Sequence, residues 1–176
     1  RFYNRVMFPI HDEQGECVAF GGRVIGTGEP KYLNSQETPL FHKGRMLYAL
    51  DKAKATMAST GVAVVSEGYT DVIAMHEAGV TNAVATLGTA LTRQHIRVLS
   101  RHARNRIVYL FDGDAAGQRA ADRALQFIDA TMTPEAGASR IDLFAVTLPD
   151  NLDPAEFLAA YGADELKALI DSAQPL

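Results

Sequence analysis

The chain has 176 residues, of which 47% are hydrophobic and 22% charged, a composition typical of a globular protein rather than a disordered or fibrous one. Its apolar runs are far shorter than the roughly 18 residues of a membrane-spanning helix, so we expect no membrane insertion. A single cysteine, Cys17, can form neither an internal disulfide nor a zinc cluster. We therefore expect a cytoplasmic protein, and because the chain begins at Arg1 rather than Met, a piece of a longer one.

The net charge of −4 is unevenly distributed along the chain. Residues 1–66 hold eight Lys and Arg against six Asp and Glu, whereas residues 67–176 hold nine against fifteen. A net acidic protein taken as a whole repels polyanions. An acidic, metal-binding half joined to a weakly basic half would, however, produce the same distribution.

The first sixty residues show a mixture of strand and loop signals. Apolar runs at 6–10 and 17–20 flank a polar turn, which predicts a β-hairpin. Gly21 and Gly22 are then expected to interrupt regular structure. A helix is predicted over residues 47–59, with Gly61 ending it.

From residue 61 onward short apolar runs alternate with helical patterns. The predicted strands cover 62–66, 82–87, 106–112 and 141–148, and the predicted helices cover 70–78, 92–104 and 115–130. A further helix is predicted to open at Asp153, with Glu156 completing a capping box, and to end at Gly162 before a short helix over 163–173. Such alternation indicates a parallel sheet covered by helices, with its ligand at the carboxyl ends of the strands.

Carboxylates follow three of the predicted strands. Glu67 comes directly after the first, Asp112 and Asp114 after the third, and Asp150 and Asp153 after the fourth. Carboxylates on one sheet edge repel each other unless a cation neutralises them. Oxygen ligands without matching His or Cys favour Mg²⁺ or Mn²⁺ over zinc.

Helix capping offers a competing explanation for some of these acids. Asp114 and Asp153 suit helix N-caps, and Asp71 suits the first turn of a helix. Glu67 has no capping role before Gly68, and capping does not explain two acids around one glycine after five apolar residues. We therefore expect a metal site at this edge of the sheet, with Glu67, Asp112 and Asp114 as the acids that capping explains least.

The spacing of these acids also resembles a known family pattern. The segments EGYTD (67–71) and DGD (112–114) resemble the Toprim motifs of primases, topoisomerases and some repair proteins. Further upstream are RFYNRVMFPI (1–10), FGGR (20–23), PKYLNS (30–35), FHKGR (41–45) and LY (47–48). Together these blocks are similar to the bacterial replicative primase of the DnaG type, along essentially the whole chain.

This resemblance implies both a fold and an activity. The fold would be an α/β Toprim-type parallel sheet of about four strands flanked by helices, preceded by part of a smaller mixed α/β basic subdomain. The domains would be residues 1–60, the end of the basic subdomain; 61–160, the Toprim subdomain; and 161–176, the start of a helical segment. The activity would be synthesis of short RNA primers on single-stranded DNA by metal-assisted nucleotidyl transfer.

The resemblance also assigns metal ligands. Glu67, Asp112 and Asp114 would be catalytic residues that hold Mg²⁺ or Mn²⁺, and Asp71 and Asp153 would be further ligands. No zinc site is expected in this chain. Ala155 stands where the family has the second acid of a D-P-D element, so that either one ligand is lost or Asp150 or Glu156 replaces it.

The implied partners are a single-stranded DNA template, ribonucleoside triphosphates and the RNA primer. The nucleic-acid- and nucleotide-binding residues would be Arg23, Lys31, Tyr32, Asn34, Lys43, Arg45 and Tyr69. The replicative helicase would bind through a C-terminal module outside this chain, and the protein would be a monomer in nucleoid-associated replication machinery. Four further arginines, Arg93, Arg97, Arg101 and Arg104, are expected on a solvated helix face.

Two other Toprim activities compete with the primase interpretation. The chain could belong to a topoisomerase or OLD-type nuclease, or to a recombination mediator that binds DNA without catalysis. A topoisomerase would need a catalytic tyrosine in a separate domain, which this chain does not offer. The PKYLNS block (30–35) favours the primase over both.

Overall fold

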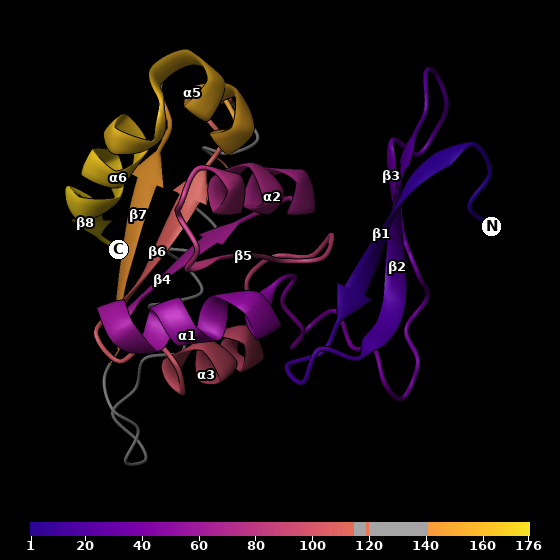
Figure 1. The fold of residues 1–176 in the computed structure, drawn as a ribbon, viewed down its shortest axis with the longest axis horizontal. Coiled ribbons are helices and arrows are strands. Elements are labelled where there is room, and N and C mark those ends of the chain that lie inside the picture. The colour runs from indigo at the N-terminus through magenta and orange to yellow at the C-terminus, as the bar shows by residue number, and fades with distance from the viewer. Residues whose placement is uncertain (115–118, 120–140) are drawn as a thin grey trace.

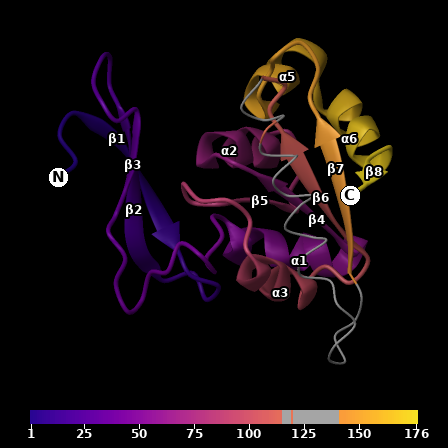
Figure 2. The ribbon, with the colours of Figure 1, turned by 180° about the vertical axis from the view of Figure 1, so that it is seen from behind.

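The computed structural model describes residues 1–114, 119 and 141–176. Two sheets organise these residues: an antiparallel sheet of order β1-β2-β3 and a sheet of order β5-β4-β6-β7-β8. Figure 1 shows the antiparallel sheet beside the β5 edge of the larger sheet, and the view from behind in Figure 2 agrees. No helix in the described part of the chain is long and apolar enough to span a membrane.

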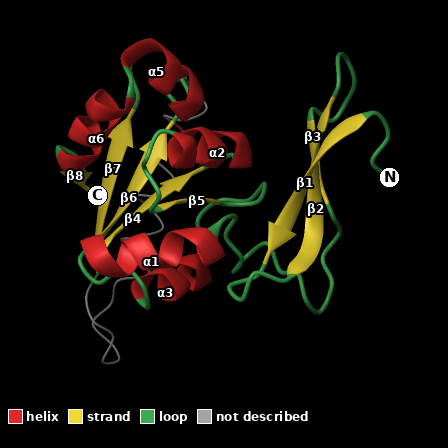
Figure 3. Ribbon diagram, in the orientation of Figure 1, coloured by secondary structure: helices red, strands yellow, loops and turns green. Residues whose placement is uncertain are grey.

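The predicted hairpin is present in the first sheet. β1 (Arg5–His11) pairs with β2 (Cys17–Val24), and the Asp12 carboxylate accepts main-chain hydrogen bonds from Gln14 and Glu16 in the turn. A third strand, β3 (Tyr32–Asn34), pairs with the other side of β2. Before the first helix the described chain forms only strands and loops (Figure 3).

The expectation that Gly21 and Gly22 interrupt regular structure is wrong, because both lie within β2. A Cβ atom on Gly21 would lie 2.8 Å from the Tyr69 ring, and one on Gly22 would lie 2.8 Å from the Phe2 ring. The strand therefore uses glycine to admit aromatic rings against its backbone, not to end its pairing.

The predicted first helix is confirmed as α1 (Leu50–Thr60), and Gly61 ends it with a φ of 74°. Immediately before this helix, Tyr48 exchanges two main-chain hydrogen bonds with Ala85 of β5 (Ala83–Ala85). The segment that joins the two sheets therefore lies along the edge of the larger one.

The larger sheet confirms the predicted α/β class. β4 (Val62–Ser66), β5, β6 (Arg106–Phe111) and β7 (Asp142–Thr147) are parallel. A two-residue strand that the sequence did not indicate, β8 (Gln174–Pro175), adds an antiparallel edge beside β7. β6 pairs with β4 and β7, and five of its six residues are buried.

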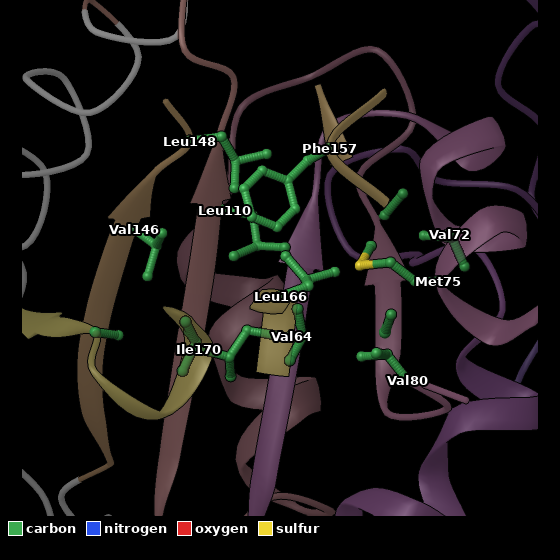
Figure 4. Packing of buried hydrophobic residues seen from close by; sticks show 14 of the residues in the cluster. Val64, Val72, Met75, Val80, Leu110, Val146, Leu148, Phe157, Leu166 and Ile170 are labelled. Atoms are coloured by element: carbon green, nitrogen blue, oxygen red, sulfur yellow. The ribbon is translucent and has the colours of Figure 1, made fainter. Parts of the chain in front are cut away.

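Helices cover both faces of this sheet (Figure 1). α1 and α3 (Arg93–Ser100) pack on one face, through residues such as Met57 and Leu99. α2 (Tyr69–Glu77), α5 (Pro154–Tyr161) and α6 (Ala163–Asp171) pack on the other. In Figure 4, Phe157 and Leu166 lie beside Leu110 of the central strand, and Met75 lies with Val72 and Val80. The end of β6 that precedes Asp112 is thereby buried under α5 and α6.

Two predicted helices differ from the described structure or lie outside it. α3 is shorter than predicted, so Arg101 only caps it and Arg104 follows it, whereas Arg93 and Arg97 are exposed on the helix. The helix predicted over 115–130 falls mainly on residues 115–118 and 120–140, which are outside the described part of the chain.

Candidate functional site

The first acidic element lies between β4 and α2. Glu67 follows the last residue of β4, and Gly68 is the N-cap of α2. Partial burial, followed by repulsion from Asp114, raises the pKa of the Glu67 carboxyl. Glu67 therefore lies near the acids that follow β6, as expected for parallel strands that end at one edge.

The second acidic element, Asp112 to Asp114, follows β6, and its central Gly113 is packed against the loop that follows β7. A Cβ on Gly113 would lie 2.3 Å from the main-chain oxygen of Leu148. The Gly113 N–H donates to the Leu152 carbonyl at 3.1 Å, and the Leu148 N–H donates to the Phe111 carbonyl at 3.0 Å. The loop that follows β7 is thus packed directly on the Asp-Gly-Asp segment, which brings Asp153 to the same edge.

Asp153 does cap α5, as the competing explanation predicted. Its carboxylate accepts from the Glu156 N–H at 2.7 Å, and the Glu156 carboxylate accepts from the Asp153 N–H at 3.2 Å. Asp153 nevertheless contributes to the raised pKa values of both Asp71 and Asp112. The Asp153 carboxylate therefore caps α5 and at the same time belongs to the acidic cluster.

Asp71 connects α2 to the start of α5. Only 7% of its surface is exposed, and its carboxylate accepts from the Ala155 N–H at 3.3 Å. Burial raises its pKa to about 7, with repulsion from Asp153 and Asp112 adding to the effect. Ala155, where an acid was expected, thus contributes a main-chain donor to a neighbouring acid instead.

The two possible replacements for that missing acid differ in their surroundings. Asp150 accepts a hydrogen bond from the Tyr161 hydroxyl at 2.7 Å, at the far end of α5. Glu156 raises the pKa of both Asp71 and Asp112. Of the two, Glu156 is the one that interacts with the acidic cluster.

Asp112 is the acid most affected by its neighbours. Burial raises its pKa to about 7, and repulsion from Glu67, Asp153, Asp114 and Glu156 adds to this, in that order. The expected ligands therefore interact electrostatically with one another: Glu67, Asp71, Asp112, Asp114 and Asp153. A bound divalent cation would relieve this repulsion.

The side chains are not yet arranged as a coordination shell. Within residues 1–114, 119 and 141–176, no three His, Cys, Asp or Glu side chains are placed to hold one metal ion. The donor chemistry still fits a hard cation, because the cluster offers carboxylate oxygens alone.

The basic residues of the first sheet gather around Tyr32. The guanidinium of Arg23 and the ammonium of Lys31 each lie 5.9 Å from the centre of the Tyr32 ring, which is 42% exposed. Arg5 supports this group, because its guanidinium donates to the carbonyls of Gly22, Pro30 and Lys31. The sequence marked Arg5 only as part of a matching block, without a role.

Tyr69 is placed differently from an exposed nucleic-acid contact. Its ring is 5% exposed and packs against Phe8, Tyr32 and Tyr48, between the two sheets. Burial raises its pKa to about 12. Its hydroxyl and the side-chain oxygen of Asn34 are buried without a hydrogen-bond partner among the described residues.

Lys43 and Arg45 come from a separate segment that precedes α1. Phe41 anchors this segment in the apolar cluster between the sheets, and the Arg45 side chain is exposed. Thr92 and His95, at the start of α3, contact its backbone. The sequence did not indicate these two residues, because their contacts join segments some fifty residues apart.

A parallel sheet with a glutamate after β4 and an Asp-Gly-Asp segment after β6 defines the Toprim class, and residues 61–142 match the family model described as Toprim domain. Residues 1–54 match a second family model, described as DNA primase catalytic core, N-terminal domain. The chain belongs to the DnaG type of bacterial primases, of whose catalytic core it forms a part. The family resemblance seen in the sequence is thereby confirmed.

Individual relatives agree with this assignment. The DNA primase of Synechococcus elongatus is 47% identical over 171 residues, which are 97% of this chain and 24% of the relative. A DNA primase domain from Pseudomonas aeruginosa has a similar structure, with a TM-score of 0.89 and 45% identity over 99% of this chain and 53% of that one. A DnaG primase catalytic domain bound to single-stranded DNA has a TM-score of 0.85 and 43% identity, over 99% and 55% of the two chains. The chain thus spans about a quarter of a curated relative and about half of these catalytic structures.

Proposed function

We propose that the protein containing this chain synthesises RNA primers on single-stranded DNA by nucleotidyl transfer. The observation that carries this proposal is that Glu67 and Asp112 follow the carboxyl ends of the neighbouring strands β4 and β6, and that the loop after β7 brings Asp153 close to Asp112. Their mutual repulsion makes this edge a strong attractor for divalent cations. The family relationship supports the particular reaction.

In this proposal Glu67, Asp112 and Asp114 hold Mg²⁺ or Mn²⁺, with Asp71 and Asp153 as further ligands. When bound, the metal would help to activate the attacking 3′-hydroxyl and to stabilise the leaving pyrophosphate. The chain itself supplies the strand ends, the main-chain contact at Gly113 and the Ala155 N–H that is donated to Asp71. These contacts support the proposal because they keep the main chain that carries the acids together at one edge of the sheet.

The basic residues would bind the phosphates of template, primer and nucleotide. Arg23 and Lys31 beside the exposed Tyr32 ring combine charge with a stacking surface, which suits a single strand. Lys43 and Arg45 would extend this charge, Asn34 would add polar contacts, and Tyr69 would support Tyr32 from beneath. The DNA-bound DnaG catalytic domain supports the choice of a single-stranded template.

The remaining partners follow from the same proposal. They are ribonucleoside triphosphates, the RNA primer and a replicative helicase that binds through a module outside this chain. The protein would be a monomer and would act in the nucleoid-associated replication machinery. A topoisomerase or nuclease activity and a non-catalytic mediator role are disfavoured by the family match over residues 1–54.

Nucleotide incorporation tests the proposal. The full-length protein would be given a single-stranded template, labelled ribonucleotides and Mg²⁺ or Mn²⁺, and wild type compared with Asp112→Asn and Asp114→Asn. Both variants are expected to lose at least about a hundredfold in rate, a typical effect of removing an electrostatic catalytic group. Asp142→Asn, an exposed position at the opposite end of the sheet, is the matched control. Primer synthesis at the wild-type rate by both variants would overturn the assignment.

A further inference from the structure

The start of α3 is bonded to the segment that carries Lys43, some fifty residues earlier in the sequence. The Thr92 hydroxyl donates to the main-chain oxygen of Gly44, and His95 Nε2 lies 2.8 Å from the main-chain oxygen of Lys43. Two consecutive carbonyls of the Lys43 segment are therefore held by two side chains of one helix terminus.

The hydrogen-bond pattern around His95 fixes its tautomer. The Thr92 N–H donates to His95 Nδ1 at 3.0 Å, so Nδ1 is an acceptor and Nε2 carries the proton that is donated to Lys43. The His95 N–H in turn donates to the Thr92 hydroxyl oxygen at 3.1 Å, which leaves the hydroxyl proton for Gly44. His95 is 0% exposed, so water does not compete for these bonds.

Other contacts hold the same segment from its far side. The Lys43 N–H donates to the Glu37 carboxylate at 3.0 Å, and the Arg45 and Met46 N–H groups donate to the His42 carbonyl. Both main-chain polar groups of Lys43 are thus hydrogen-bonded, its N–H to Glu37 and its carbonyl to His95. Among the residues described, none forms an ion pair with the Lys43 ammonium.

We propose that Thr92 and His95 are positioning residues that fix the Lys43–Gly44 backbone, so that the Lys43 ammonium is held ready for a phosphate of single-stranded nucleic acid. This inference rests on the proposed function, in which Lys43 binds the strand. It assigns α3 a role in substrate binding although neither side chain touches the substrate.

Helix capping alone does not account for the arrangement. A capping box needs only two acceptors, the Thr92 hydroxyl oxygen and His95 Nδ1. The two donors directed at the carbonyls of Lys43 and Gly44 add nothing to the cap. The Thr92 hydroxyl takes part in both roles, and His95 uses a different ring nitrogen for each. A second background, in which Lys43 is absent, is therefore needed to separate positioning from capping.

The test measures binding of the full-length protein to a labelled single-stranded oligonucleotide across a range of salt concentrations. Thr92→Ala and His95→Leu are expected to weaken binding about three- to tenfold, a typical range for a lost hydrogen bond. They are also expected to reduce the salt slope by about 0.7, the value for one phosphate contact to a single strand. Thr92→Ser and His95→Gln keep an acceptor and a donor, and are expected to stay within about twofold of wild type.

The Lys43→Ala background distinguishes positioning from general damage to α3. If Thr92 acts through Lys43, then Thr92→Ala has no further effect on affinity in that background. Should the alanine variant fold poorly, the comparison is repeated with Thr92→Gly, because glycine at an N-cap position destabilises a helix less than alanine does. Ser100→Ala, at the other end of the same helix, is the control and is expected to bind as wild type.

The possible failures are distinguishable. If Lys43→Ala weakens binding but Thr92→Ala weakens it equally in both backgrounds, the positioning role is overturned while the proposed function stands. If Lys43→Ala changes neither affinity nor salt slope, the assigned role of Lys43 fails, and the inference fails with it.

Discussion

Gly113 and Leu148 are in direct main-chain contact: a Cβ atom at position 113 would lie 2.3 Å from the Leu148 carbonyl oxygen. This contact joins the loop after β6 to the loop after β7, and each loop carries acids of the candidate metal site. The glycine between the two aspartates is therefore required by packing, in addition to any approach of a substrate to the backbone.

Gly113→Ala is expected to destabilise the protein by about 1–3 kcal/mol, the usual range for an added group in a site with no room. Urea unfolding of the full-length protein would measure the change in the free energy of unfolding. Gly44→Ala is the matched control, because a Cβ there meets no atom within 4 Å. Equal stability of the two variants would show that the β7 loop moves away freely.

Mg²⁺ is expected to raise the thermal midpoint of the wild-type protein, because a ligand that binds only the folded state stabilises it. Asp112→Asn is expected to reduce this increase and, since it removes a charge from a repelling cluster, to raise the midpoint without metal. Calorimetry with and without a chelator measures both effects. An undiminished Mg²⁺ effect in Asp112→Asn, with Asp142→Asn as control, would argue against Asp112 as a ligand.

Protonation of His95 is expected to destabilise the fold at low pH. Burial lowers the pKa of His95 below its ordinary value of 6.5, although hydrogen bonds to the Lys43 and Met46 carbonyls act in the opposite direction. The unfolded chain therefore binds the proton at a higher pH, so stability is complete above pH 6.5 and is lost as the pH falls below it. A second proton, on Nδ1, would also face the Thr92 N–H.

His95→Gln removes this titration but keeps a donor and an acceptor. The difference between wild type and His95→Gln in the free energy of unfolding, followed from pH 7.5 to pH 5, is expected to change by at most about 1.4 kcal/mol per pH unit. A difference that does not change with pH would contradict the assignment of a buried neutral imidazole.

Tyr32→Ala is expected to weaken binding to single-stranded DNA about fivefold or more, because stacking of one base contributes about 1–3 kcal/mol. The salt slope should stay unchanged, since no cation is removed. Tyr32→Phe keeps the ring and should bind as wild type in the same anisotropy titration. A reduced salt slope in Tyr32→Ala would show instead that the ring positions Arg23 or Lys31.

The sequence alone was sufficient for the α/β class and for the acids at the strand ends. Apolar runs define β4 and β6, and the capping pattern at Asp153 is a purely local signal, so both were predictable. The course of β2 through Gly21 and Gly22 was not, because it depends on the Tyr69 ring from a distant helix. The contacts of Thr92 and His95 with Lys43 were missed for the same reason.

The β5 edge of the larger sheet is partly covered by this same chain, whereas the short strand β8 forms its other edge. β8 pairs beside β7 on one side, and on the other side Tyr48 occupies the hydrogen-bonding groups of Ala85 in β5. An uncovered edge of this kind is a template for pairing with another molecule. The connection between the two sheets thus also shields part of this edge, and truncating the protein just before Leu50 would leave the main-chain groups of Ala85 open to another molecule.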